Sequence, residues 1–281
     1  MAQHTRRVRL GASCWNPYTL HPYEIAGQVA ALDLASDGRA YLGIARGAWL
    51  SAIGVQQPHP IATIREAIGL VWRLLARDPR GFQGQVFRVE PGIALRYEVL
   101  RPRVPLLVGT WGTKLAELGG ELADEVKVGG SANPRMVNIM RERIAVGAAR
   151  AGRRVDEVGI VLGAVTVVDE DGVRARCRAR TEVAMYADVV AGLDPTLDVP
   201  LDLRARIAEL VRRGEHQAAG QLISGDLLDA LAFAGTPEHV IRQVERVLEA
   251  GARRVEFGTP HGLTDDRGLE LLGSSVLPYF R

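Results

Sequence analysis

Short apolar, β-branched runs alternate along this chain with longer amphipathic runs. Such alternation is typical of βα units and predicts a parallel sheet covered by helices. Strands are expected over Arg7–Ala12, Arg39–Ile44, Val104–Val108, Glu125–Val128, Val158–Val167 and Arg254–Phe257. Helices are expected over Tyr23–Ala35, Ile61–Leu75, Leu115–Ala123, Pro134–Ala151, Val173–Val190 and Pro237–Ala250.

Two stretches interrupt the alternation. Arg77–Arg103 is rich in Gly, Pro and Arg, and predicts a long loop with a small hairpin around Phe82–Val89. Gly192–Asp229 predicts an inserted helical segment, with helices over Leu201–Arg213 and near His216–Leu222. No linker or internal repeat is visible, so residues 1–281 are expected to form a single domain.

The number of predicted strands leaves two architectures open. A closed (β/α) barrel needs eight strands, whereas an open doubly wound sheet can be built from the six that the pattern predicts. The hydrophobic pattern alone does not choose between them.

Composition narrows the class of protein. Hydrophobic residues make up 47% and charged residues 24% of the 281 residues, which is ordinary for a globular protein without membrane spans. The basic start of the chain has no apolar segment behind it, so no signal peptide is expected and a cytoplasmic location is the default. Cys14 and Cys177 are too few for a disulfide framework, and no two of the six histidines have i, i+4 spacing. We therefore expect no metal site.

The formal net charge of +2 says little about partners. Nearly all basic residues are Arg, with Lys114 and Lys127 the two lysines, and the Arg residues are interspersed with Asp and Glu. A basic stripe, which marks nucleic-acid binding, is absent from the sequence. Neither a nucleic acid nor a membrane is expected as a partner.

Three segments carry a resemblance to a known family. They are the strand–helix–strand unit Arg7–Gly47, the segment Val104–Pro134 that ends in S-A-N-P, and Leu227–Gly262, which contains A-G-T-P-E-H. In this order and spacing they resemble the bacterial-luciferase superfamily of flavin- and F420-dependent enzymes, nearest the methylenetetrahydromethanopterin reductase branch. The resemblance implies an α/β fold, a TIM (β/α)8-type barrel of luciferase type with a helical insertion before the last strand.

Compared with that family, the chain starts at the third strand. The first two βα units, which supply substrate and cofactor contacts in relatives, are not in the sequence. A mis-assigned or truncated start, replacement of the strands by a partner chain, and a natural open barrel all remain open. The first two are favoured because an open barrel exposes unpaired strand edges.

The resemblance assigns two segments to the ring of a flavin-like cofactor. Ser13–Cys14 matches a bulge with a non-prolyl cis peptide that presses on the ring; the alternative is an ordinary strand end, and Cys14 as a nucleophile has no predictable base partner. Ala45–Arg46–Gly47 follows the next strand, where small residues let backbone amides approach a ring edge, or simply form a tight turn. Relatives often carry an acid at the next position, where this chain has Ala48.

A third segment, Thr110–Trp111–Gly112–Thr113–Lys114, lies between a predicted strand and helix. Backbone N–H groups at a helix N-terminus, two hydroxyls and a lysine make a phosphate cradle for F420 or FMN. The alternative is a Thr N-cap at the start of the helix with a solvated Lys114.

Three further segments have weaker claims. Gly129–Pro134 is interpreted mainly as a turn with Asn133 as N-cap, and Arg174–Arg180 as a solvated helix face. Asp229 matches a region where relatives place an acidic residue beside the substrate pocket; it is the one catalytic candidate, against the alternative of a solvated helix face that it shares with Asp226.

We therefore predict an oxidoreductase that transfers a hydride between coenzyme F420 and a small organic, pterin-type or other, substrate. An FMN-dependent luciferase-like monooxygenase is the alternative enzyme. A non-catalytic flavin-binding or partner subunit is the third hypothesis, motivated by the absent half-site. On the family resemblance the protein is expected to be a homodimer.

Overall fold

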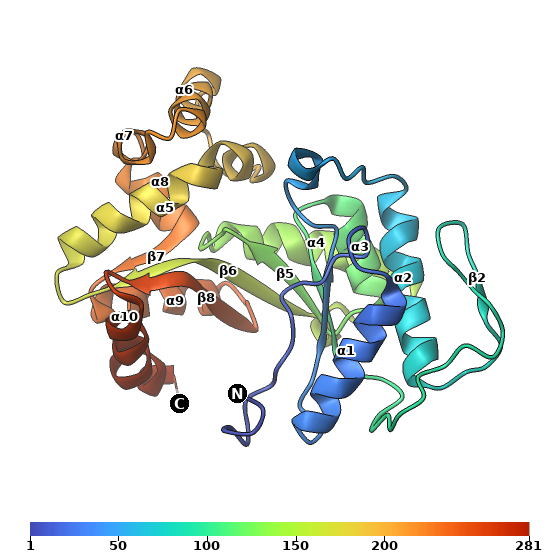
Figure 1. Cartoon of the computed structure of the whole chain (residues 1–281). Helices are drawn as coiled ribbons and strands as arrows, with labels where there is room; N and C mark the ends of the chain where they lie inside the picture. The colour runs from blue at the N-terminus through green and yellow to red at the C-terminus, as the bar shows by residue number, and fades with distance from the viewer. Residues whose placement is uncertain (281) are drawn as a thin grey trace. The chain divides into compact units, whose positions relative to one another are not determined.

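The computed structural model describes residues 1–280 and divides the chain into two compact units (Figure 1). Unit 1 consists of Met1–Val126 and Arg143–Val158, and unit 2 consists of Lys127–Glu142 and the chain from Gly159 onward. The boundaries fall within β5 (Glu125–Gly129) and within α4 (Arg135–Arg150).

Unit 1 is built from parallel strands and the helices that follow them. Its elements are α1 (Pro22–Ala35), β1 (Leu42–Ala45), η1 (Leu50–Ile53), α2 (Pro60–Leu75), β2 (Phe82–Gln83), β3 (Arg88–Val89), β4 (Leu106–Gly109), α3 (Thr113–Leu122) and η2 (Val155–Glu157). β1 and β4 pair in parallel from Leu42↔Leu106 to Ala45↔Gly109, so their carboxyl ends lie side by side. α1 packs on α2, and α2 packs on β1 and α3.

The apolar spacing explains why α2 forms where the sequence predicts it. Ile64, Ile68, Val71 and Leu75 recur at helical spacing and are all buried. Pro60 begins the helix, where its missing N–H removes no helical hydrogen bond. The stripe faces β1 and the neighbouring helices and forms the centre of the unit 1 core.

The predicted loop between α2 and β4 is fixed to the helices by side chains. Arg101 forms an ion pair with the buried Asp33 of α1, with Nη2 2.5 Å from Oδ1, and Tyr97 donates to the Gly27 carbonyl at 3.1 Å. The Arg103 guanidinium lies 4.1 Å from the Trp72 ring centroid. The hairpin predicted within this loop is confirmed, because β2 and β3 pair antiparallel.

Glu66 of α2 caps the turn of this hairpin. Its carboxylate accepts hydrogen bonds from the backbone N–H groups of Gln85, Val86 and Phe87, at 2.7, 2.9 and 3.0 Å. Burial raises the pKa of Glu66, but the three N–H donors outweigh burial, and the pKa is lowered below its ordinary value of 4.5. The hairpin is therefore held to α2 by an ionised carboxylate.

We expect Glu66→Gln to destabilise the protein by about 1–2 kcal/mol at pH 7. The substitution replaces a carboxylate that accepts from three backbone N–H groups by an uncharged amide with one acceptor oxygen. Because the pKa of Glu66 is lowered in the folded state, its contribution to the free energy of unfolding is full above pH 4.5. This contribution is lost as the pH falls through the pKa of the folded state. Urea unfolding between pH 3 and pH 7 measures this, with the exposed Glu90 of the same hairpin, changed to Gln, as control. If the free energy of unfolding of Glu66→Gln and of Glu90→Gln depends on pH in the same way, Glu66 does not hold the hairpin to α2 as described.

The first predicted strand is wrong in detail. Residues Arg7–Ala12 run beside β1 but form only isolated bridges, at Leu10↔Ala40 and, just beyond, at Trp15↔Ile44. The Arg39 guanidinium bonds the carbonyls of Ala2, Thr5 and Val8 at 2.6–2.9 Å, and of these only Val8 lies within the predicted strand. A side chain thus satisfies one acceptor that a neighbouring strand would otherwise satisfy.

Unit 2 is built around the long strand β6 (Gly159–Val168). The other elements are α5 (Gly172–Leu193), α6 (Leu201–Arg212), α7 (His216–Gln221), α8 (Gly225–Leu231), β7 (Ala232–Gly235), α9 (Pro237–Glu249), β8 (Arg254–Gly262), α10 (Asp265–Leu271), a π-helical turn η3 (Leu272–Val276) and η4 (Leu277–Phe280). β6 pairs in parallel with both β7 and β8. The sequence did not predict β7, because a run of four residues, A-F-A-G, is too short to show a period.

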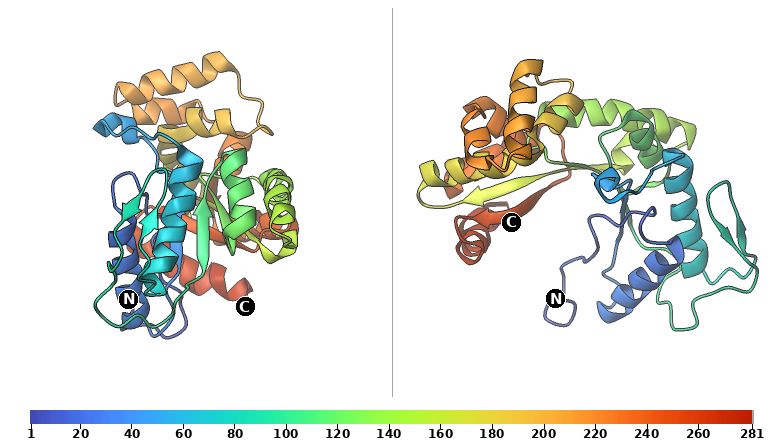
Figure 2. Two further views of the ribbon diagram at one scale, coloured as in Figure 1. Left: turned by 90° about the vertical axis from the view of Figure 1, so that its right-hand side faces the viewer. Right: turned by 45° about the horizontal axis from the view of Figure 1, so that its top comes forward.

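The inserted helical segment predicted over Gly192–Asp229 is confirmed. α6 and α7 pack against α5 and against each other (Figure 2). α7 lies close to the α5 backbone because Gly220 has no side chain: a Cβ atom there would lie 3.0 Å from Arg180 C and from Thr181 N. Within residues 1–280, no helix is both long and apolar enough to cross a bilayer.

A buried lysine ties β5 to β8. Lys127 is 8% exposed, and its Nζ lies 2.5 Å from Oε1 of Glu256. The stem passes over Gly163 of β6, where a Cβ atom would lie 2.9 Å from Lys127 Cε. Without a side chain at Gly163, the charged group reaches its partner and the burial of the lysine is compensated.

Candidate functional site

Three loops of unit 1 meet at the carboxyl ends of β1 and β4. A Cβ atom on Gly109, the last residue of β4, would lie 3.0 Å from Cys14 Sγ and 3.2 Å from Ala45 Cβ. Ser13–Cys14, Ala45–Gly47 and Gly109–Lys114, here called the rim, are therefore close neighbours. The sequence predicted that these segments share one edge of a parallel sheet, and the structure brings them together.

The Ser13–Cys14 peptide bond is cis, as the resemblance implied. The chain leaves this bond along β1, with Trp15 N donating to the Gly43 carbonyl and Ala45 N donating to the Trp15 carbonyl, both at 2.9 Å. Gly43 is required here, because a Cβ atom at this position would overlap the Ala12 carbonyl oxygen. The missing side chain at Gly43 thus lets Ser13–Cys14 lie against the end of β1.

Ala45–Arg46–Gly47 forms a turn with a left-handed residue at Gly47, where φ is 85°. Gln57 Nε2 donates to the Arg46 carbonyl at 2.6 Å and to the Gly47 carbonyl at 3.3 Å, which fixes the turn from outside. Both interpretations of this segment, as a tight turn and as a ring contact, are compatible with that geometry.

The Thr110–Lys114 loop differs from the alternative in which a Thr caps the helix. Gly112 is the N-cap of α3, and no side chain caps the helix there. Thr110 Oγ1 instead accepts from Gly112 N at 2.9 Å, closing a small turn before the helix. The loop is also held from α4, since Arg143 Nη1 donates to the Trp111 carbonyl at 2.7 Å.

Lys114 is at the surface and makes only a long ion pair with its neighbour Glu117. Its side chain is 74% exposed, and Nζ lies 3.4 Å from Oε1 of the buried Glu117. Arg150 also bonds Glu117, with Nη2 2.9 Å from Oε2, and this hydrogen bond is the main reason that the pKa of Glu117 is lowered. Because Arg150 balances Glu117, Lys114 can turn toward an anion without leaving a buried charge uncompensated.

The rim suits a ligand that has a flat body and a phosphate. β1 and β4 are buried up to Ile44 and Val108, whereas no residue from Ala45 to Gly47 or from Gly109 to Lys114 is buried. The uncapped start of α3, the hydroxyls of Thr110 and Thr113, and Lys114 supply the groups that bind phosphate. Cys14, Ala45 and Gly109, which meet at the strand ends, have small side chains or none.

Asp229 lies on α8 of unit 2 and faces the helices α5 and α9. Its Oδ1 is 2.6 Å from Arg176 Nη1 on α5 and 3.2 Å from Gln243 Nε2 on α9, and 3.8 Å from His239 Nε2. Burial, together with Arg176, lowers the pKa of His239, although Asp229 opposes this. The catalytic assignment of Asp229 stays a prediction, and the contacts account for its charge as a tie between helices.

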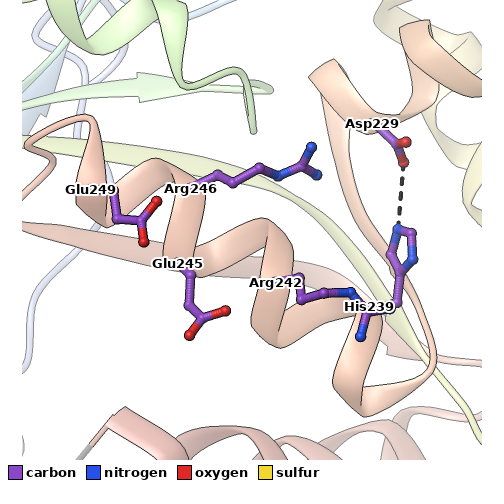
Figure 3. A pocket seen from close by; sticks show the side chains of 6 residues that line it. All are labelled: Asp229, His239, Arg242, Glu245, Arg246 and Glu249. Carbon is purple, nitrogen blue, oxygen red and sulfur yellow. Dashed lines mark ion pairs between the residues drawn. The ribbon is translucent and has the colours of Figure 1, made fainter.

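A surface hollow beside Asp229 runs along α9 (Figure 3). Apart from Asp229, its lining consists of α9 side chains of both charges: His239, Arg242, Glu245, Arg246 and Glu249. Alternating charges on an exposed helix face are typical of a solvated surface. No cluster of His, Cys, Asp and Glu among residues 1–280 has the arrangement of a metal site.

Two other sequence interpretations are settled by contacts within unit 2. Asn133 starts α4 as expected, accepting from Arg135 N at 3.1 Å, and its Nδ2 bonds Asp194 and Thr196 at 2.8 and 2.7 Å. The solvated-face interpretation of Arg174–Arg180 is wrong for Arg176 and Arg180, which bind Asp229 and the Ile223 carbonyl respectively.

Sequence reasoning missed Gly43, Gly109 and Arg143. A glycine within or at the end of a predicted strand is a signal for close backbone approach, and this signal could have identified Gly43 and Gly109. Arg143 lies 32 residues from the carbonyl it bonds, on another helix, and nothing in the sequence marked it.

Comparison with known proteins gives the class. Residues 1–254 match the family described as luciferase-like monooxygenase, and the chain belongs to that family. It is 28% identical to the 5,10-methylenetetrahydromethanopterin reductase of Methanopyrus kandleri, over 99% of this chain and 84% of that protein. It is 27% identical to the F420-dependent glucose-6-phosphate dehydrogenase of Nakamurella multipartita, over 99% of this chain and 79% of that protein.

Solved structures agree on the fold. The coenzyme F420-dependent tetrahydromethanopterin reductase of Methanopyrus kandleri superposes with a TM-score of 0.85 at 25% identity, covering all of this chain and 85% of that one. An FMN-bound type II Baeyer–Villiger monooxygenase constituent from Pseudomonas putida, at 16% identity, has a TM-score of 0.66 over 99% of this chain and 81% of that one. The α/β fold of parallel strands and helices is thus that of luciferase-like TIM-barrel proteins, as predicted.

Proposed function

We propose that the protein is an F420-dependent oxidoreductase that transfers a hydride between the deazaflavin and a small organic substrate. The observation that carries the proposal is the meeting of Cys14, Ala45 and Gly109 at the carboxyl ends of β1 and β4, one loop away from the uncapped start of α3. Relatives named as F420-dependent enzymes, which match 99% of this chain, support F420 as the cofactor.

The chain's own residues would bind and orient the cofactor. Bound F420 supplies the hydride chemistry itself. The N–H groups at the start of α3, the Thr110 and Thr113 hydroxyls and Lys114 would hold the phosphate, and Arg143 fixes the loop that presents them. The Ser13–Cys14 segment would support one face of the ring, so that the opposite face meets the substrate.

An FMN-dependent monooxygenase is the second candidate, favoured by the description of the family and by the FMN-bound structural neighbour. The two are distinguished by purifying the protein, denaturing it, and identifying the released cofactor by mass and fluorescence. If none is retained, titration with F420 and with FMN gives the preference. The proposal would be abandoned if FMN were retained or bound more tightly, or if neither compound bound.

Lys114→Met should weaken F420 binding about three- to tenfold, because it removes an exposed cation from the proposed phosphate cradle. Stability should change little, since Arg150 still balances Glu117. Fluorescence titration at two salt concentrations measures the loss, which should shrink at high salt. Arg88→Met on the β2–β3 hairpin is the matched control; equal F420 affinities for the two variants would argue against the cradle.

A further inference from the structure

One side chain holds both carbonyls of the turn that follows β1. Gln57 Nε2 lies 2.6 Å from the Arg46 carbonyl oxygen and 3.3 Å from the Gly47 carbonyl oxygen. The two peptide bonds that carry these carbonyls are trans, and in a trans peptide the C=O and N–H groups point in opposite directions. The N–H groups of Gly47 and Ala48 therefore face away from Gln57.

These two N–H groups are unpaired donors at the rim. Among residues 1–280, neither the N–H group of Gly47 nor that of Ala48 finds an acceptor. Gly47 is half-buried and Ala48 is exposed, and both closely follow Ala45, whose side chain meets Gly109 at the strand ends. Successive N–H groups without a partner in the fold suit a ligand that presents acceptor atoms to them.

The glycine in this turn allows the peptide groups to point either way. Gly47 has φ of 85°, and glycine populates positive and negative φ about equally, so the peptide groups beside it can turn over at little cost. Turning over would present carbonyl oxygens where the N–H groups of Gly47 and Ala48 now stand. Gln57 selects the observed orientation, because only there can its amide bond both carbonyls.

Gln57 is held in place by the residue that follows it. The Pro58 carbonyl accepts from the Tyr18 hydroxyl at 2.9 Å and from the Thr63 hydroxyl at 3.1 Å. Thr63 is buried in the first turn of α2, and Tyr18 lies four residues after Cys14. The pair Gln57–Pro58 thus ties the turn after β1 and the segment after Ser13–Cys14 to the same end of α2.

We propose that Gln57 is a positioning residue of the cofactor site. It holds the Arg46 and Gly47 carbonyls away from the cofactor, so that the N–H groups of Gly47 and Ala48 donate to acceptor atoms on the edge of the ring. This rests on the proposed function, in which the rim binds F420. Gln57 acts through the turn that it orients.

The test compares Gln57→Met, which keeps the length of the side chain and removes the donor, with Gln56→Met at the neighbouring exposed glutamine. Fluorescence titration of the full chain should give a Kd for F420 about tenfold higher in Gln57→Met and an unchanged Kd in Gln56→Met. The absorption band of bound F420 is the second readout. It should be shifted from that of free F420 in the wild type, because donors polarise the acceptor atoms of the ring, and should return toward the free position in Gln57→Met.

The outcomes separate this inference from the proposed function. If the wild type does not bind F420, both fall. If the wild type binds F420 but Gln57→Met has the Kd and the absorption band of Gln56→Met, the positioning role is overturned and the proposed function stands. A higher Kd with an unshifted band would show a general loosening of the loop and would also overturn the positioning role. If Gln57→Met does not fold, Gln57→Asn, whose amide is one methylene too short to reach both carbonyls, is judged by the same two readouts.

Discussion

Gly43→Ala should reduce F420 affinity by about 100-fold or more. A Cβ atom at Gly43 would overlap the Ala12 carbonyl oxygen, and neither group is a flexible side-chain end that can turn aside. The Ser13–Cys14 segment would have to move away from β1, and with it the proposed support for the cofactor ring. Misplacement of a binding segment by about 1 Å is enough to cost a large factor. Fluorescence titration of F420 measures the effect.

The control is Gly273→Ala, at a glycine with nothing within 4 Å of the added Cβ atom. It should bind F420 as the wild type does. Circular dichroism of Gly43→Ala should still show a folded α/β protein, because the overlap affects one edge segment and not the cores of the helices. Unchanged F420 affinity in a folded Gly43→Ala variant would remove Ser13–Cys14 from the site.

Gly147→Ala should destabilise the protein by about 3 kcal/mol or more. The α3 and α4 helices touch backbone to backbone in unit 1, where a Cβ atom on Gly147 would overlap the Glu117 carbonyl and one on Gly120 would overlap the Ile144 carbonyl. Overpacking of a close helix contact forces the backbones apart and costs the contacts on both sides. Urea unfolding compared with Gly273→Ala measures the difference.

Gly120→Ala is the second variant at the same contact and should show a similar loss. On propensity alone, alanine is favoured over glycine in a helix by up to about 1 kcal/mol. Helix propensity therefore predicts that the substitution raises the stability, whereas the close helix contact predicts that it lowers the stability. A stability equal to or above that of the wild type in both variants would show that the helices do not approach as closely as the structure indicates.

Much of the fold could be predicted, because helix and strand periods are local properties. The apolar stripe of α2 and the T-P-E start of α9 fix those helices, and Thr236 does accept from His239 N, at 3.4 Å. Prediction from local patterns failed for two short strand segments. The first strand was expected where only bridges form, because the pattern could not show that Arg39 occupies the Val8 carbonyl. Strand β7 was missed because four residues carry no period.

The sequence by itself determined the family, the parallel α/β class, the helical insertion and the three segments that form the rim, since each rests on motifs and periods carried by neighbouring residues. Only the tertiary structure decided that Gly112, and not a Thr, is the N-cap of α3, and that Arg176 binds Asp229 instead of facing solvent. It also showed that Gly43 makes room for Ser13–Cys14. The Arg176–Asp229 and Gly43–Ala12 contacts join residues far apart in the chain. A close approach of that kind depends on how elements pack, which no local pattern encodes.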